Sequence, residues 1–363
     1  MRALAVWVSI CLATALLAAC AAAPAASNAA NAASTADTGR LRARQVAPDT
    51  WFVQGEAALG SPANRNFISN AGFVVTDGGV VVIDALGSPA LGQALIDEIR
   101  RITPQPIRFV IITHYHADHI YGLQAFKAAG ATILAHRAGR DYLGSEAAQL
   151  RLQASRQDLA PWIDGQTRLV EADRWLDEPE TVLRVGSAEL RIRHVGPAHT
   201  GEDLAVHLPR QRVLVAGDLV FQGRIPFVGQ ADSRQWIESL NQLLGFDARV
   251  IVPGHGPVSS DPAGDLRLTR DYLQHLRKTM GDAARNLEPF DEELVKQLAE
   301  ETTTLVRHEL ELLRYKRAGK RPRVLREKIR RQQNAECERP KKPIGAKARN
   351  FVFHKIKIRF LKS

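Results

Sequence analysis

Three imidazoles and one carboxylate crowd into six consecutive positions of this 363-residue chain, at His114, His116, Asp118 and His119. Side-chain packing alone does not explain such a cluster. Neutral imidazole and ionised carboxylate are ligands that zinc accepts, and no cysteine stands nearby to supply a thiolate. The cluster therefore predicts a metal site with nitrogen and oxygen ligands.

The residues on either side predict that the cluster lies on a loop between a buried strand and a helix. Residues 109–112 form an apolar run rich in β-branched side chains, as expected of a strand buried on both faces, and we expect this strand over residues 108–113. Residues 119–129 carry one apolar face and are followed by Gly130, which is typical of a helix end. Open α/β sheets place their functional sites at the carboxyl ends of parallel strands, and we expect the cluster at such an edge.

Three more candidate ligands follow apolar, strand-like runs in the same way: His199, Asp218 and His255. Glycine or proline stands close to each of them, which allows the backbone to turn sharply. We therefore expect four strands to end in loops that carry His or Asp.

With these residues the chain resembles the metallo-β-lactamase superfamily over roughly residues 45–290. The resemblance is carried by an H-x-H-x-D-H motif and a later His, Asp and His, which stand here as His114, His116, Asp118, His119, His199, Asp218 and His255. It implies an αββα sandwich with the site at the shared edge of two sheets. Hydrophobic periodicity alone predicts only the α/β class.

The resemblance also implies two zinc ions, with iron or manganese as alternatives. The ligands would be His114, His116 and His199 for one ion, Asp118, His119 and His255 for the other, and Asp218 between them. Two such ions lower the pKa of a shared water toward neutrality, and the resulting hydroxide attacks the substrate. Asp118 would orient this nucleophile and relay a proton.

Two further residues are candidates for supporting the ligands. By resemblance, Asp84 orients a ligand-bearing loop, whereas an aspartate at a strand end is otherwise a turn or cap residue. Thr200 is a candidate hydrogen-bond donor beside His199, or an ordinary strand residue. The remaining histidines are predicted to be structural or on the surface: His136, His194, His207, His275, His308 and His354.

The identity of residue 218 separates branches of the superfamily. True β-lactamases carry Cys or Ser at the position of Asp218, and a carboxylate is typical of thioester, lactone and phosphodiester hydrolases. Residues 66–76, 80–87 and 217–220 resemble the exported quinoprotein relay system zinc metallohydrolases. The expectation is a zinc-dependent hydrolase of an ester, thioester, lactone or lactam bond in a small-molecule substrate.

Three alternatives stay open at this point. The first is a β-lactamase (B3-like subclass), and the second is an iron-dependent oxidoreductase such as a persulfide dioxygenase, which shares the fold. The third is a protein that binds a partner through its basic C-terminal residues.

The first twenty residues predict export. Met1 and Arg2 precede an apolar run that is too short to span a bilayer comfortably, and the run ends in Leu-Ala-Ala-Cys at Cys20. This ending resembles a bacterial lipoprotein signal, which implies acylation of the Cys20 sulfur and a membrane anchor; an ordinary cleaved signal peptide is the alternative. Residues 21–44 then form a flexible linker, and either reading predicts a periplasmic protein.

The C-terminal part differs in charge from the rest of the chain. Residues 291–313 predict an amphipathic helix, and residues 314–363 form a basic tail with 19 Lys and Arg against three acidic residues. The tail's net charge of +16 exceeds the +10 of the whole chain, so the remaining residues carry −6. A disordered extension is favoured over a surface for nucleic acid or anionic lipid, because an exported enzyme meets little nucleic acid.

Periodicity and turn residues predict the other elements of the catalytic domain. Strands are expected at 51–55, 66–75, 79–83, 132–135, 204–208, 213–216 and 249–252, a hairpin over 181–195, and helices over 90–102 and 233–244. Residues 221–228 form an apolar loop that either lines a substrate pocket or packs on its own domain.

Overall fold

The computed structural model describes residues 40–284. The chain separates into two units, Met1–Arg42 and Ala43–Ser363, and the second contains every helix and strand described below. The predicted signal segment with Cys20, most of the predicted linker, the helix predicted over 291–313 and the basic tail lie outside the described residues.

The first sheet contains seven strands in sequential order. They are β1 (Arg44–Ala47), β2 (Thr50–Val53), β3 (Ala71–Thr76), β4 (Gly79–Ile83), β5 (Ile107–Ile111), β6 (Thr132–His136) and β7 (Arg174–Leu176). Strands β1 to β4 pair antiparallel, and β4 to β7 pair parallel. The parallel half therefore brings the carboxyl ends of β4, β5 and β6 to one edge.

The second sheet contains five strands in the order β12-β11-β10-β9-β8. They are β8 (Glu180–Val185), β9 (Ala188–His194), β10 (Leu204–Leu208), β11 (Val213–Phe221) and β12 (Val250–His255). Strands β8 to β11 pair antiparallel, as the predicted hairpins require, and β11 pairs parallel with β12.

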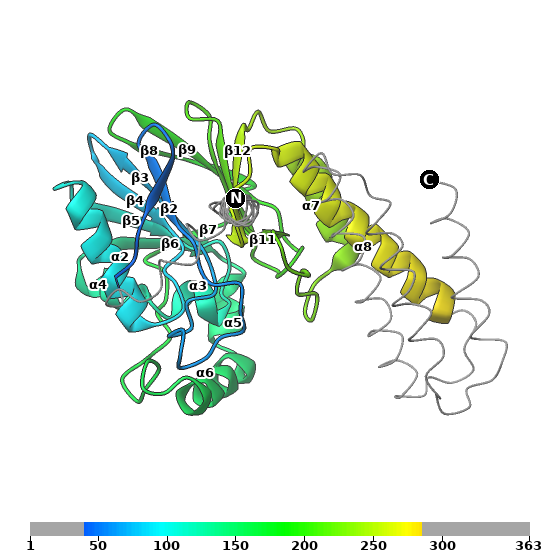
Figure 1. Cartoon of the computed structure of the whole chain (residues 1–363), viewed down its shortest axis with the longest axis horizontal. Helices are drawn as coiled ribbons and strands as arrows, with labels where there is room; N and C mark the ends of the chain where they lie inside the picture. Colours follow the sequence, from blue (N-terminus) through cyan, green and yellow to red (C-terminus); the bar gives the residue numbers. More distant parts are fainter. Residues whose placement is uncertain (1–39, 285–363) are drawn as a thin grey trace, which may run out of the picture. The chain divides into compact units, whose positions relative to one another are not determined.

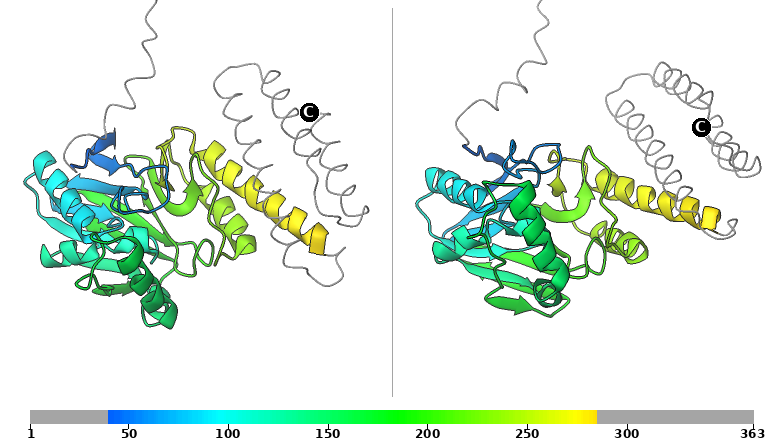
Figure 2. Two further views of the ribbon diagram at one scale, coloured as in Figure 1. Left: turned by 60° about the horizontal axis from the view of Figure 1, so that its bottom comes forward. Right: turned by 90° about the horizontal axis from the view of Figure 1, so that it is seen from below.

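Helices cover the outer face of each sheet (Figures 1 and 2). Helices α2 (Pro89–Ile102) and α4 (Leu123–Ala128) contact each other over the first sheet, and α7 (Ser233–Leu243) contacts α8 (Pro262–Ala284) over the second. The remaining helices are α3 (Ala117–Ile120), α5 (Gly139–Leu143) and α6 (Glu146–Asp158). This arrangement confirms the predicted αββα sandwich.

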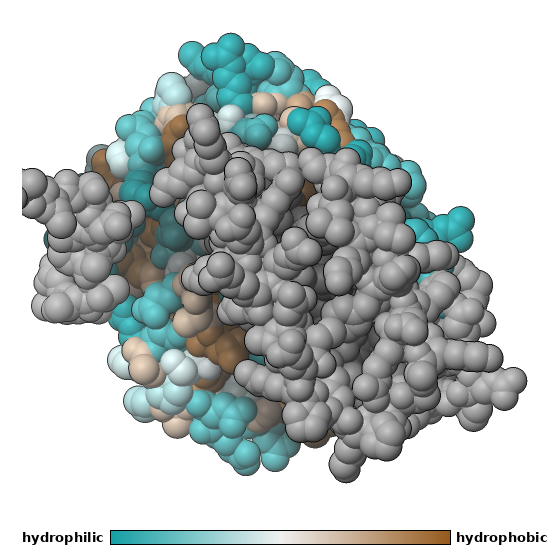
Figure 3. Space-filling view, turned by 45° about the vertical axis from the view of Figure 1, so that its right-hand side comes forward, coloured by the Kyte–Doolittle hydropathy of each residue, from teal (hydrophilic) through white to brown (hydrophobic). Residues whose placement is uncertain are grey.

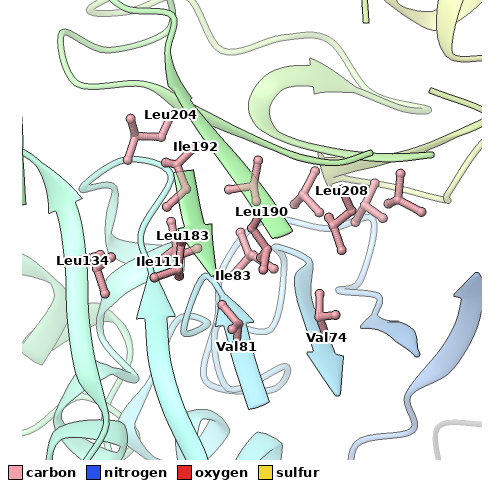
Figure 4. Packing of buried hydrophobic residues seen from close by; sticks show 14 of the residues in the cluster. Val74, Val81, Ile83, Ile111, Leu134, Leu183, Leu190, Ile192, Leu204 and Leu208 are labelled. Atoms are coloured by element: carbon pink, nitrogen blue, oxygen red, sulfur yellow. The ribbon is translucent and has the colours of Figure 1, made fainter. Parts of the chain in front are cut away.

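Apolar side chains from the two sheets meet in one core (Figure 4). The first sheet contributes Val81, Ile83, Ile111 and Leu134, and the second contributes Leu183, Leu190, Ile192 and Leu204. A separate cluster lies between the second sheet and its helices, where Trp236 is fully buried. Each buried side chain of this size stabilises the fold by roughly 1.5–3 kcal/mol.

Two predicted elements of the first half of the domain have wrong boundaries. The strand predicted over 66–75 begins only at Ala71, because Arg65 and Asn66 have positive φ angles of 58° and 61° and residues 54–70 form a loop. The helix predicted over 119–129 divides into α3 and α4. A Cβ at Gly122 would lie 1.9 Å from the Ala85 carbonyl oxygen, so the backbone breaks at this close approach.

The second sheet also departs from expectation. Asp218 lies inside β11 and not after it, because the strand continues to Phe221 through a register shift between Val215 and Gly217. The strand therefore includes the start of the predicted apolar loop. Asp232 caps α7 by accepting hydrogen bonds from the backbone N–H groups of Arg234 and Gln235.

The visible part of the described surface in Figure 3 is mainly hydrophilic, with smaller hydrophobic areas. Over residues 40–284, no helix combines the length and apolar character that a bilayer crossing requires.

Candidate metal centre

The structure brings all seven predicted ligand residues to the shared edge of the two sheets. His114 and His116 lie on the loop after β5, and Asp118 and His119 belong to the short helix α3 that follows. His199 lies on the loop between β9 and β10, Asp218 lies within β11, and His255 is the last residue of β12. Residues up to 141 positions apart in the sequence, His114 and His255, thus converge on one site.

The side chains form two groups whose nitrogen and oxygen atoms lie within 4.8 Å of one another. One group contains His114, His116 and His199 together with Asp218, and the other contains Asp118, His119 and His255. We call the three histidines of the one the first ligand group and the three residues of the other the second ligand group, and we treat Asp218 separately.

The Asp218 carboxylate faces both groups. Its Oδ2 lies 3.7 Å from His114 Nε2 and 3.3 Å from His199 Nε2 in the first ligand group. The same oxygen lies 3.3 Å from His255 Nε2, and Oδ1 lies 3.2 Å from His119 Nε2 in the second. This approach depends on Gly254, because a Cβ there would lie 2.0 Å from Asp218 Oδ1.

The donor atoms at this edge fit metal ions. His114 Nε2 is buried and has no hydrogen-bond partner within residues 40–284, and the buried His119 Nε2 and Asp218 Oδ1 lie 3.2 Å from each other. A buried polar atom without a partner costs about 1–3 kcal/mol, and a cation recovers this free energy by taking the lone pairs.

Hydrogen bonds orient the first ligand group. His199 Nδ1 lies 3.0 Å from the Phe227 carbonyl oxygen and donates its proton there, which leaves Nε2 with a free lone pair. That Nε2 lies 2.9 Å from His116 Nδ1. Two ring nitrogens at this distance can both direct lone pairs at one ion.

A carboxylate and a carbonyl orient the second ligand group. His119 Nδ1 lies 2.9 Å from Asp84 Oδ2, and Asp84 also accepts hydrogen bonds from the backbone N–H and hydroxyl of Thr113. His255 Nδ1 lies 2.7 Å from the Ile68 carbonyl oxygen, so it donates its proton to that oxygen. Arg224 lies 3.1 Å from the same nitrogen and does not donate to it, because a protonated nitrogen has no lone pair.

Burial and neighbouring charges move the pKa values of the two groups in opposite directions. Burial, together with the neighbouring imidazole of His119, lowers the pKa of His114 well below its usual value. Burial likewise lowers the pKa of His199 to about 4. The imidazoles of His114 and His199 are therefore neutral at pH 7 and available to a cation.

In the second ligand group the carboxylates outweigh burial. Although burial opposes it, Asp218, Asp118 and Asp84 raise the pKa of His119 well above its usual value. Burial also disfavours the charged form of His255, but Asp218 and Asp118 outweigh it and raise the pKa of His255 to about 9. Burial raises the pKa of Asp118 and of Asp218, but the histidines facing them outweigh it and hold both below the usual value, so both are ionised at pH 7.

Of the two predicted supporting residues, Asp84 contacts a ligand and Thr200 does not. Asp84 contacts His119 directly, in the orienting arrangement that the resemblance implies. Thr200 donates its hydroxyl to Asp203 Oδ1 and not to His199. Thr200 therefore stabilises the loop that carries His199 and makes no hydrogen bond to the ligand itself.

The other described histidines lie outside both groups. The rings of His136 and His194 stack with centroids 3.5 Å apart, and His207 stacks on Phe246. His275 belongs to α8, and His308 and His354 lie outside the described residues.

The apolar loop reaches the site through one side chain. Phe227 is 57% exposed, and its ring centroid lies 6.1 Å from that of His116 and 6.2 Å from that of His199. An exposed aromatic ring beside the first ligand group is placed to contact the apolar part of a substrate.

Sequence reasoning missed several residues that hold the site together. They are Ser69, Asn70, Thr113, Glu202, Asp203 and the Phe227 carbonyl. One signal could have found some of them, because Ser69 and Asn70 are polar residues that interrupt an apolar run.

Comparisons with known proteins bear on this geometry. A family model described as the Metallo-beta-lactamase superfamily matches residues 64–255. A linear primary-alkylsulfatase of Pseudomonas sp. (strain ATCC 19151) is 25% identical over 234 residues, which cover 54% of this chain and 44% of the relative. A metallo-beta-lactamase type 2 of Bacillus sp. (strain 170) is 28% identical over 243 residues, or 66% of this chain and 84% of the relative.

Two solved structures share the fold. A metallo-beta-lactamase from Pontibacter korlensis has a TM-score of 0.52 at 23% identity. The match covers 65% of this chain and 99% of the Pontibacter chain. The sec-alkylsulfatase Pisa1 from Pseudomonas sp. has a TM-score of 0.54 at 19% identity. The match covers 70% of this chain and 46% of the alkylsulfatase. The match thus spans less than half the length of each alkylsulfatase.

Proposed function

Because the chain belongs to the metallo-beta-lactamase superfamily, we propose that it is an exported di-zinc hydrolase that cleaves an ester, thioester, lactone or lactam bond of a small molecule. One observation carries the proposal: two ligand groups of imidazole nitrogens and carboxylate oxygens lie within reach of one carboxylate, Asp218. Alkylsulfatases and β-lactamases, the relatives named above, are hydrolases.

Each ligand group would hold one ion, with Asp218 in reach of both. When bound, the two ions supply positive charge that activates water and polarises the bond to be cleaved. The protein's own part is to orient the ring nitrogens toward the ions, and the hydrogen bonds of His199 to Phe227 and of His119 to Asp84 fix the rings for this purpose.

Asp118 is placed to handle the proton of the attacking water. Its side chain is 16% exposed, compared with 4% for Asp218, so Asp118 has the greater access to solvent. The histidines of the second ligand group lower its pKa, which keeps the carboxylate ionised. An ionised Oδ2 can accept a hydrogen bond from water and then hold the proton that the water loses.

β-Lactam hydrolysis is a second candidate, favoured by the 28% identity with the Bacillus enzyme over 84% of that enzyme. The carboxylate of Asp218 argues against it, since true β-lactamases of this superfamily carry Cys or Ser there. Turnover of nitrocefin, lactones, thioesters, phosphodiesters and sulfate esters by one preparation separates these substrate classes.

The proposal includes a lipid anchor at Cys20, which rests on the sequence of the first twenty residues. Replacing the thiol in Cys20→Ser should move the protein from the membrane fraction to the soluble periplasmic fraction. An unchanged distribution would leave an ordinary cleaved signal peptide as the reading.

Elemental analysis and mutagenesis test the hydrolase directly. We expect about two zinc ions per chain, and loss of turnover in His116→Ala and after chelation. His136→Ala removes a buried histidine that belongs to neither ligand group, and should keep both metal and turnover. Full activity without metal would contradict the proposal, and iron in place of zinc would favour the oxidoreductase.

A further inference from the structure

Three consecutive residues, Ile68, Ser69 and Asn70, run beside the second ligand group, and we call this segment the strap. It closes the loop between β2 and β3 and is well buried, with Ser69 at 0% and Asn70 at 2% exposure. Buried polar side chains outside helices and strands need partners, and those of the strap find them on the backbone that carries Asp118 and His255.

The first two strap residues each reach a ligand of the second group. The Ser69 hydroxyl donates a hydrogen bond to the carbonyl oxygen of Asp118. The Ile68 carbonyl oxygen accepts the Nδ1 proton of His255 at 2.7 Å, and this fixes the tautomer that directs Nε2 into the site.

Asn70 holds the backbone on both sides of His255. Its Nδ2 donates to the carbonyl oxygens of Pro253 and Gly256, each at 2.8 Å, and its backbone N–H donates to the Gly254 carbonyl oxygen at 2.8 Å. Its Oδ1 accepts a hydrogen bond from the backbone N–H of Gly55. The position of the His255 ring therefore depends on one amide side chain.

The first ligand group has other supports. His199 is oriented by the Phe227 carbonyl, His114 Nδ1 lies 3.1 Å from the Thr113 hydroxyl, and Glu202 accepts the backbone N–H of Tyr115 between His114 and His116. Within residues 40–284, no hydrogen bond joins the strap to a histidine of the first ligand group.

We propose that the strap positions the second ligand group, and that Asn70 thereby sets how tightly this group holds its ion. Asn70 is a positioning residue, since it acts through His255 and touches no ligand atom. The inference rests on the proposed function in one respect only, which is that metal ions bind at this edge.

Asn70→Asp is the sharpest test. The substitution keeps the size of the side chain and the acceptor for Gly55, but it removes both Nδ2 donations. Asn66→Asp is the matched control, because Asn66 lies in the same loop, is 4% exposed, and donates its Nδ2 to the Gly87 carbonyl oxygen away from both ligand groups. Both variants place a carboxylate at a buried amide position.

The measurement is a Zn²⁺ titration of the metal-free, full-length protein against a chromophoric chelator, which yields two stepwise dissociation constants. We expect Asn70→Asp to raise one constant about 10- to 100-fold, the range for losing a residue that supports a ligand. The other constant should change less than about 2-fold, and Asn66→Asp should change neither.

The His255→Ala background identifies the affected group. That variant lacks a ligand of the second group, so adding Asn70→Asp should cause no further loss of affinity for the ion that remains. Cobalt substitution supplies a spectroscopic readout, because the d–d absorption of the second ion should shift in Asn70→Asp and that of the first should not. A rise of both constants, or an equal effect in the His255→Ala background, would overturn the proposal.

Ser69→Ala keeps the proposal testable if Asn70→Asp does not fold. It removes one hydrogen bond to the Asp118 carbonyl and should raise the second constant about 2- to 10-fold. If the second dissociation constant stays unchanged in a folded strap variant, only the positioning role of the strap is contradicted. A wild-type protein that binds no metal would contradict the proposed function.

Discussion

The two ligand groups differ in charge although they share one edge and one carboxylate. His114 and His199 of the first ligand group have lowered pKa values, because burial disfavours the charged ring. His119 and His255 of the second have raised pKa values, because carboxylates outweigh the same burial. Burial of similar depth therefore leaves His114 and His199 neutral at pH 7, whereas His119 and His255 hold their protons more tightly.

This difference indicates how each group would receive a cation. The first ligand group offers neutral imidazoles at pH 7, so an ion can bind without displacing protons from His114 or His199. The second ligand group has Asp118 and Asp84 beside its histidines, and these carboxylates stabilise protons that an incoming ion must expel. We therefore expect the two ions to bind with different dependence on pH.

The largest expected effect is that of pH on the second dissociation constant. At pH 7 binding of the second ion should release protons from His119 and His255, so its affinity should rise by about 10-fold per pH unit or more as pH approaches 9. The first constant should change less steeply above pH 5, since His199, with a pKa of about 4, releases no proton there. Calorimetry in buffers of different ionisation enthalpy counts these protons, and equal release by both ions would break the comparison.

Asp218→Asn should weaken the binding of both ions, because the carboxylate faces both groups. Loss of its negative charge should raise each dissociation constant by about 100-fold, at the upper end of the range for supporting residues, since Asp218 is itself a candidate ligand. The chelator titration measures both constants. A loss confined to one ion would assign Asp218 to that group alone.

Asp84→Asn should affect ion binding by the second ligand group more than ion binding by the first. The variant removes the charge that holds the His119 Nδ1 proton, so the second constant should rise about 10- to 100-fold and the first should rise less. Asp77→Asn is the control, because Asp77 is an exposed aspartate that accepts hydrogen bonds from Ser187 away from both groups. A larger effect on the first ion would mean that Asp84 acts mainly through Thr113, which contacts His114.

Substitution of Glu202 should have the smallest effect on ion binding, and the affected constant should be that of the first ligand group. Glu202→Ala removes the acceptor for the Tyr115 backbone N–H and should raise the first constant about 2- to 10-fold, as for one lost hydrogen bond. Glu202→Gln keeps an oxygen acceptor at the same position and should leave the constant near its wild-type value. A change in the second constant alone would contradict the division of supports between the groups.

Much of the fold and the ligand set could be predicted from the sequence, because both depend on local patterns. The apolar runs before His114 and His255 predicted buried strands, and a motif with known spacing identified the cluster. Asp218 and His255 were predicted to follow their strands but lie within them, because a register shift lets β11 continue and β12 extends to His255 beside Phe221.

The supports of the site could not be predicted in the same way. Ser69 and Asn70 hydrogen-bond to backbone that lies 49 and up to 186 positions away in the sequence, and backbone carbonyls leave no trace in side-chain patterns. The strap itself was predicted as part of a strand, since Phe67 and Ile68 are apolar and an apolar run follows from Ala71. The positive φ angles at Arg65 and Asn66 fall on residues other than glycine, so the sequence does not indicate the turn there.

Anomalous scattering at the zinc absorption edge, recorded from crystals of the full chain grown with zinc, tests the central claim most directly. The account predicts two peaks at the shared edge of the sheets, one bounded by His114, His116 and His199 and the other by Asp118, His119 and His255, with Asp218 between them. Crystals of active enzyme in which these side chains hydrogen-bond to one another, with no peak among them, would contradict it.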